Sequence, residues 1–201
     1  MIIDLTQLMF KIRNYVFLVI TAVCTLSCEE ETIEVPLEDE RLIHYDGVNV
    51  SAPQILEGLH ESSIRFESRH LLPYQGRILE SIQFYISYVP DDLTLRIYKN
   101  ERSSNEPQTL LYEALITGSR ASSWNTYDLT EGLMIDDSEL WISLRYSLAE
   151  TQRVIGCDAG PAFVNGDWEY SGFEDNWSNF RTRTNNQISI NWNIRGVLSA
   201  L

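Results

Sequence analysis

Apolar residues at every second position mark four stretches of the chain: 82–88, 93–97, 140–146 and 188–194. Side chains two positions apart lie on the same face of a β-strand, so this pattern predicts strands with one buried and one polar face. The polar residues between them predict scattered outward side chains and not a contiguous site. Because no twelve-residue window has the period of an amphipathic helix, the pattern favours an all-β antiparallel sandwich over β-α-β units.

Further short strands are predicted at 64–66, 110–116, 124–129 and 154–157. Turn-forming residues at 89–92 predict a hairpin between the first two of the alternating stretches. Trp141 lies on the side opposite to Leu140 and Ile142, so we expect it to be exposed or covered by a loop.

The composition fits one folded domain and limits the classes of partner. The chain has 201 residues, of which 44% are hydrophobic and 22% are charged, and this balance excludes a disordered or multi-span membrane protein. The formal net charge of −14 disfavours nucleic acid and anionic membrane surfaces as partners. Three cysteines are too few for a disulfide-built scaffold.

The first 27 residues have the features of a secretory leader. Lys11 and Arg13 precede an apolar run at 15–23, which is too short to cross a bilayer about 30 Å thick. The run ends in Leu26-Ser27-Cys28, which resembles a bacterial lipobox. This resemblance implies a lipoprotein signal peptide at 1–27 and a lipidated Cys28 that attaches the protein to the membrane through its acyl chains only. A leader followed by an incidental cysteine is the alternative.

An acidic segment separates the leader from the domain. Residues 29–41 hold seven acidic side chains and one basic side chain, so they repel one another and favour a solvated tether over 28–41. Acids directly after the lipidated cysteine also resemble the surface-export signal of Bacteroidota lipoproteins. The resemblance implies an outer-membrane lipoprotein exposed at the cell surface, with residues 42–201 as its β-sandwich domain.

The order of short motifs along the domain resembles a known family. The sequence contains Ile64-Arg65-Phe66, Tyr74-Gln75-Gly76, Leu95-Arg96-Ile97-Tyr98, Gly156-Cys157-Asp158 and finally Asn191-Trp192-Asn193. This succession is similar to the jelly-roll modules of Bacteroidota surface proteins, which are related to the cleaved adhesin domains of gingipains, and it covers about residues 60–198. The resemblance implies a jelly roll that contacts glycans or proteins and that in this family often binds calcium; the alternative is that it binds no cofactor.

Asp158 is the candidate metal ligand. It lies between Gly156 and Gly160 in a tight turn, where its carboxylate could coordinate a hard cation such as calcium. The alternative, which we favour, is that the carboxylate binds backbone amides of its own turn. Cys157 is expected to be a buried structural thiol and not a nucleophile.

The densest aromatic stretch, 166–180, is the candidate ligand site. Its aromatic rings stand among glycines and acids, which predicts a loop that stacks on sugar rings and accepts hydrogen bonds from hydroxyls. The candidate ligand-binding residues are Asp167, Trp168, Tyr170, Asp175 and Trp177. In the alternative, Trp168 and Trp177 fill the core or cover one end of the sandwich.

These features together predict a non-catalytic, lipid-anchored surface module that binds a neutral glycan or a surface protein. One alternative is a structural accessory subunit of an envelope complex without a small ligand. Another is a glycan hydrolase, which needs two carboxylates roughly 5–10 Å apart. The sequence singles out no such pair, and it contains no Gly-x-Ser-x-Gly nucleophile motif.

Overall fold

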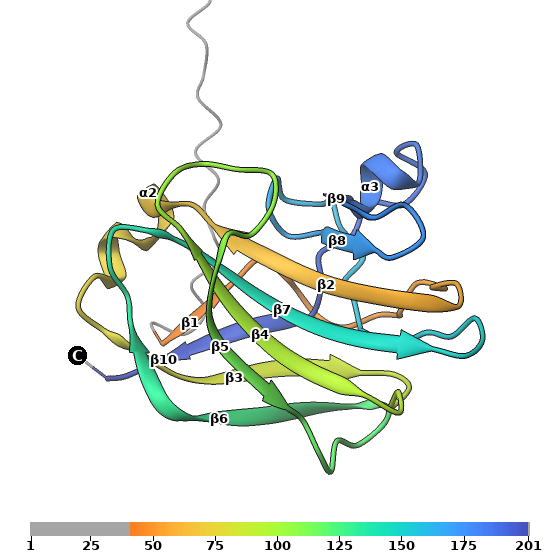
Figure 1. Cartoon of the computed structure of the whole chain (residues 1–201), viewed down its shortest axis with the longest axis horizontal. Coiled ribbons are helices and arrows are strands. Elements are labelled where there is room, and N and C mark those ends of the chain that lie inside the picture. Colours follow the sequence, from red (N-terminus) through yellow and green to blue (C-terminus); the bar gives the residue numbers. More distant parts are fainter. Residues whose placement is uncertain (1–40, 201) are drawn as a thin grey trace, which may run out of the picture. The chain divides into compact units, whose positions relative to one another are not determined.

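The computed structural model describes residues 41–200, which form two antiparallel β-sheets packed face to face (Figure 1). The predicted signal peptide at 1–27, Cys28 and the tether up to residue 40 lie outside the described residues. One sheet has the strand order β1-β10-β3-β6 and the other has the order β5-β4-β7-β2-β8-β9. The strands are β1 (Leu42–His44), β2 (Gly58–Phe66), β3 (Ile78–Ile86), β4 (Leu93–Asn100), β5 (Thr109–Leu115), β6 (Ser123–Met134), β7 (Glu139–Leu148), β8 (Trp168–Ser171), β9 (Asn176–Asn179) and β10 (Ile194–Leu198).

The connections between the strands are those of a jelly roll. Strands β1, β3, β6 and β10 form one sheet, while β2, β4, β5 and β7 form the first four positions of the other, so the chain repeatedly crosses between them. The β8–β9 hairpin extends the second sheet beyond β2. Three short helical segments occur in the described residues: α2 (Ser68–Leu71), η1 (Leu72–Tyr74) and α3 (Phe180–Arg183). The predicted all-β jelly-roll sandwich is therefore confirmed.

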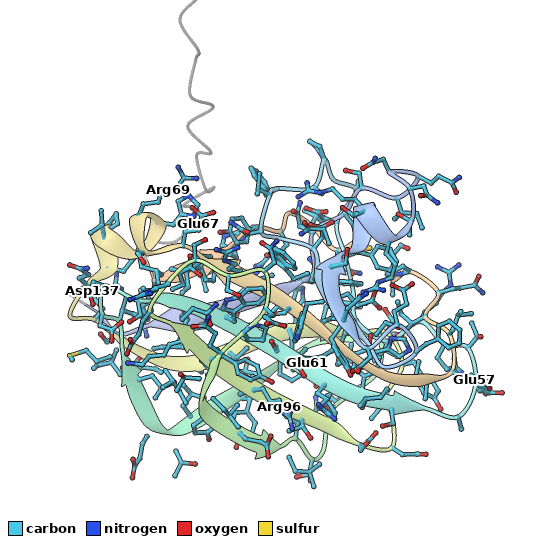
Figure 2. The ribbon with its side chains drawn as sticks, turned by 45° about the horizontal axis from the view of Figure 1, so that its top comes forward. Glu57, Glu61, Glu67, Arg69, Arg96 and Asp137 are labelled. Carbon is cyan, nitrogen blue, oxygen red and sulfur yellow. The ribbon has the colours of Figure 1, made fainter. Side chains whose placement is uncertain are left out.

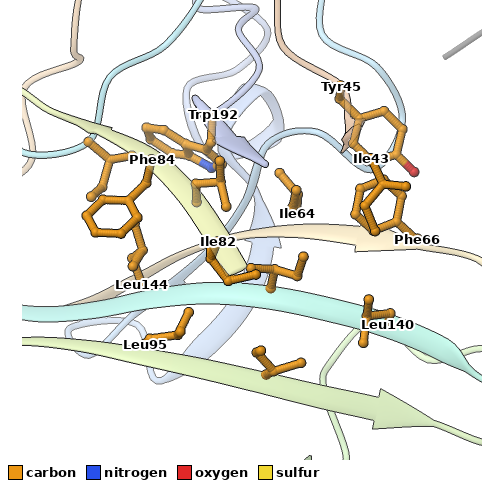
Figure 3. Close-up of a cluster of buried hydrophobic side chains, with 14 of the residues drawn as sticks. Ile43, Tyr45, Ile64, Phe66, Ile82, Phe84, Leu95, Leu140, Leu144 and Trp192 are labelled. Atoms are coloured by element: carbon orange, nitrogen blue, oxygen red, sulfur yellow. The ribbon is translucent and has the colours of Figure 1, made fainter. Parts of the chain in front are cut away.

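The core lies between the sheets and is built from the alternating apolar positions (Figure 3). Ile82 and Phe84 on β3 are fully buried, as are Leu95 on β4 and Leu144 on β7. Trp192 closes the same cluster and is also fully buried. Burial of such side chains contributes about 1.5–3 kcal/mol each, so these strands provide most of the stabilisation that holds the two sheets together.

Three local predictions are wrong. Residues 154–157 are not a strand, because Ile155 and Cys157 form only isolated bridges, with Ile86 and with Ser51 and Trp192. The turn at 89–92 does not form a hairpin, because β3 and β4 belong to different sheets. Strand β3 pairs with β10 and β6, whereas β4 pairs with β5 and β7. The stretch 188–194 is not one strand, because β10 begins only at Ile194. Asn191 and Asn193 instead turn their side-chain amides to the buried carboxylates of Asp158 and Asp46.

Candidate functional site

The candidate site lies on the outer face, which we define as the surface of the six-stranded sheet that points away from the core. Cross-strand pairing places its side chains in rows, because residues directly opposite one another share a face. One row runs from Thr94 on β4 through Arg145, Glu61 and Tyr170 to Trp177 on β9. Five strands thus contribute one residue each to this row.

An aromatic cluster occupies the end of this face next to the β8–β9 hairpin. Trp141 on β7 is fully buried, with its ring centroid 5.1 Å from that of Trp168 and 5.6 Å from that of Trp177. Tyr170 packs on Trp177 at 5.8 Å, and both rings keep part of their surface exposed. Trp141 is therefore not exposed. The β8–β9 hairpin covers it, where the sequence predicted that a loop could do so.

The predicted aromatic ligand-binding residues of the hairpin differ in exposure: Trp168 is buried, whereas Tyr170 and Trp177 are partly exposed. Residues 166–180 do not form a loop, because β8 pairs with β2 and β9 pairs with β8 in regular register. Trp168 is only 6% exposed, so its ring belongs to the packed cluster and presents no open face to a ligand. Trp177 and Tyr170 are the partly exposed pair, and the Tyr170 hydroxyl donates a hydrogen bond to Asp175 at 2.7 Å.

A buried carboxylate lies in the middle of the outer face. Glu61 is 2% exposed and accepts a hydrogen bond of 2.8 Å from the Tyr98 hydroxyl. Its Oε2 lies 3.7 Å from Arg96 Nη1 and 3.8 Å from Arg145 Nη1. Figure 2 shows Glu61 and Arg96 close together over the middle of the sheet. Burial raises the pKa of Glu61, an effect that Tyr98 and the two arginines oppose.

A second ion pair on the same face, between Arg65 and Glu139, is buried and not accessible to a ligand. Arg65 donates to both oxygens of Glu139, at 2.8 and 3.2 Å, and its guanidinium lies 5.5 Å from the Trp141 ring. The side chains of Arg65 and Glu139 are each 6% exposed. This pair therefore fills the face next to Trp141, whereas Arg96 and Arg145 are 23% and 32% exposed and border the accessible part.

Sequence reasoning missed Glu61, Arg96 and Arg145 as candidate site residues. Each occupies a polar position of an alternating strand, which is the only local signal that they carry. They become neighbours because β2 pairs with β7 and β7 pairs with β4. These pairings bring Arg96 and Arg145 to Glu61, although all three residues are far apart in the sequence.

Asp167 is directed away from the aromatic pair. It is fully buried, and its carboxylate accepts hydrogen bonds from the Arg181 backbone amide at 3.0 Å and from Asn179 Nδ2 at 3.1 Å. These contacts hold the start of α3 against the hairpin. Burial raises the pKa of Asp167 from 3.8 to about 6, because the hydrogen bonds compensate only part of the desolvation.

This shift predicts a pH-dependent stability. Between pH 4 and 6 the folded state binds a proton at Asp167 that the unfolded state has lost, so stability should fall as the pH rises through this window. Asp167→Asn removes the titration. We expect the free energy of unfolding of the variant, relative to the parent, to rise by on the order of 2–3 kcal/mol between pH 4 and pH 7. Urea denaturation at both pH values measures this difference, and a constant difference would disprove the assignment.

Asp158 has the environment of a structural carboxylate. It accepts hydrogen bonds from the backbone amides of Gly47, Gly160 and Asn191 at 2.8–3.0 Å and from Asn191 Nδ2 at 2.9 Å. Each oxygen thus receives two N–H donors, which leaves no lone pair directed at a cation. These donors do not fit a calcium site at Asp158. Residues 41–200 also contain no cluster of three His, Cys, Asp or Glu side chains that could hold a metal.

A second buried carboxylate, Asp46, ties its own segment to the start of β10. Asn193 Nδ2 donates to it at 2.6 Å, and Arg195 donates through Nε and Nη2 at 3.0 and 2.9 Å. Between these segments Cys157 is buried, and burial raises the pKa of its thiol to about 11. The thiolate that a nucleophile requires is therefore disfavoured at neutral pH.

The comparisons with known proteins identify no family. No family model matches the chain, no curated protein matches it, and no solved structure matches it. Within residues 41–200, no helix has the length and apolar character needed to span a membrane.

Proposed function

We propose that this protein is a non-catalytic glycan-binding module and that the outer face of the six-stranded sheet is its binding surface. The observation that carries this proposal is the partly exposed Tyr170–Trp177 pair, which continues directly into the polar row formed by Glu61 and Arg145. Aromatic faces stack on the C–H faces of sugar rings, while the partly exposed guanidinium of Arg145 can donate hydrogen bonds to hydroxyls. A paired sheet holds these groups in place, which lowers the entropy lost on binding.

The expected ligand is a neutral glycan in the first instance. The net charge of −14 repels a polyanionic chain over its whole length, whereas a neutral chain meets no such barrier. The accessible part of the site is shallow, because Glu61 and Trp141 are buried beneath it. We therefore expect weak binding that depends on few contacts.

A glycan panel read by tryptophan fluorescence or calorimetry tests the proposal. Trp177→Ala should weaken the binding of any responding glycan at least tenfold, since it removes about 1.4 kcal/mol or more of stacking. Trp124→Ala is the matched control, because Trp124 is 39% exposed but lies on β6 of the other sheet. Equal losses in the two variants, or no response from any glycan, would refute the proposal.

The proposal includes a surface location. A lipid on Cys28 and the acidic tether would display the domain at the outer membrane, with the membrane contacted through the lipid alone. The kinship with Bacteroidota surface lipoproteins and with the cleaved adhesin domains of gingipains belongs to the same proposal, supported by the order of the sequence motifs and by the jelly-roll connections.

Cys28→Ser tests the anchor directly. The variant should remain an unprocessed precursor or leave the membrane fraction, whereas the parent should partition into detergent and carry the mass of acyl chains. Cys157→Ser serves as the control, because Cys157 is buried in the domain and should not affect partitioning. If the parent carries no added lipid mass and fractionates like Cys28→Ser, the protein has no lipid anchor at Cys28.

One observation favours a protein partner as the second candidate. Phe173, in the turn of the β8–β9 hairpin, is 95% exposed, which is unusual for a large apolar side chain. A protein surface could bury this ring without using the outer face, as in a structural accessory subunit of an envelope complex. Phe173→Ser should then abolish assembly while glycan binding stays unchanged.

A further inference from the structure

Arg145 differs from the other arginines of the outer face in how few of its donors are used. Its only ion pair within residues 41–200 is with Glu61, at 3.8 Å, its charge also acts on the Tyr170 hydroxyl, and its guanidinium makes no hydrogen bond there. Arg65, in contrast, donates to both oxygens of Glu139. Arg96 donates to the Tyr98 hydroxyl and lies 2.7 Å from Glu113. Arg145 therefore keeps its hydrogen-bonding capacity for an external group.

The position of Arg145 makes that capacity accessible. Its side chain is 32% exposed, whereas Glu61 beneath it is 2% exposed. In the row across the sheet, Arg145 pairs with Glu61, and Glu61 pairs with Tyr170. A sugar ring stacked on Tyr170 and Trp177 would thus direct substituents toward Arg145. Only the buried Glu61 lies between Tyr170 and Arg145 in the row.

Arg145 shares its one carboxylate partner with Arg96, although the charges of Glu61, Glu113, Arg96 and Arg145 sum to zero. Glu61 shares its single negative charge among the Tyr98 hydroxyl, Arg96 and Arg145. The groups that face Glu61 are Tyr98 and Arg96 from β4, Ser143 and Arg145 from β7 and Tyr170 from β8, with Glu113 of β5 beyond Arg96. An incoming carboxylate on the exposed side of Arg145 would complete the pairing that Glu61 leaves open. A guanidinium binds a carboxylate through two parallel hydrogen bonds, a geometry that a sugar hydroxyl cannot match.

We infer that Arg145 is a specificity-determining residue that binds the carboxylate of an acidic sugar unit, such as a terminal uronic acid, placed on an otherwise neutral glycan. The inference rests on the proposed glycan-binding function and narrows its ligand class. A single carboxylate at the end of a chain reconciles the local positive charge of Arg145 with the net charge of −14, because only one unit of negative charge approaches the protein.

Two oligosaccharides that differ only in their terminal unit, glucuronic acid or glucose, test the inference by calorimetry with the full-length protein. The acidic form should bind about tenfold more tightly at low salt, and this preference should shrink as salt is added. Arg145→Gln should abolish the preference, so that the two forms bind the variant with equal affinity. Arg145→Lys should restore part of it, because lysine keeps the charge and loses the planar pair of donors.

Arg120→Gln is the matched control, since Arg120 is exposed in the turn before β6 and should not affect either ligand. An unchanged melting temperature shows that Arg145→Gln is folded. Equal binding of the two oligosaccharides by the parent, or a preference that survives Arg145→Gln, would overturn this inference and leave the glycan-binding proposal intact. If neither oligosaccharide nor any other glycan binds, both are overturned.

Discussion

Asp158→Ala is expected to lower the free energy of unfolding by about 3–5 kcal/mol, because it leaves several buried N–H donors without an acceptor. The carboxylate accepts from three backbone amides and one side-chain amide that come from residues 47, 160 and 191. Its loss therefore releases three segments that are far apart in the sequence. Chemical denaturation of the parent and the variant measures the change.

Asp137→Ala is the control for this substitution. Asp137 is exposed in the connection between β6 and β7, so the same change should alter stability by less than about 0.5 kcal/mol. Parent and Asp158→Ala should each melt at the same temperature in calcium chloride and in EDTA. A calcium-dependent rise that is present in the parent and absent in Asp158→Ala would show that the carboxylate holds a metal, against this account.

Trp141→Ala is the second substitution with a large expected effect, a loss of about 3–5 kcal/mol. The ring is fully buried and packs against Trp168, Trp177 and the guanidinium of Arg65. Removing it opens a cavity under the β8–β9 hairpin. Because Trp177 would lose its support, we expect glycan binding to weaken in the same variant, even at temperatures where it stays folded.

Trp141→Phe should retain most of the stability, since it preserves an aromatic ring at the centre of the cluster. Trp124→Ala provides the comparison for an exposed tryptophan and should cost clearly less. Its ring packs on Tyr85 and under Arg195 but is 39% exposed. If Trp141→Ala destabilised the protein no more than Trp124→Ala does, the aromatic cluster would not be a cohesive unit.

The sequence predicted the class of fold well, because alternation is a local property. Ile82, Phe84 and Leu144 alternate with polar residues and are buried as expected. The pairing of the strands was harder to predict from the sequence. Turn chemistry at 89–92 indicates that the chain reverses direction, but whether the next strand joins the same sheet depends on contacts far away in the sequence.

The candidate site was predictable only in part, for the same reason. The aromatic stretch 166–180 was visible in the sequence, and it supplies Tyr170 and Trp177. Its strand character was hidden, because β8 and β9 are four residues each and depend on pairing with β2. Glu61 and Arg145 looked like ordinary solvent-facing residues, and only the β2–β7 pairing brings them together.

The indole N–H signals of the five tryptophans provide the most direct test of the central claim, that the outer face is the binding surface. In an NMR titration with the glycan that binds best from the panel, the Trp177 signal should shift, since its ring is at the accessible end of the row. The signals of Trp124 on the other sheet and of Trp192 between the sheets should stay in place. A shift of Trp124 without one of Trp177, or the absence of any shift with every glycan, would contradict the account.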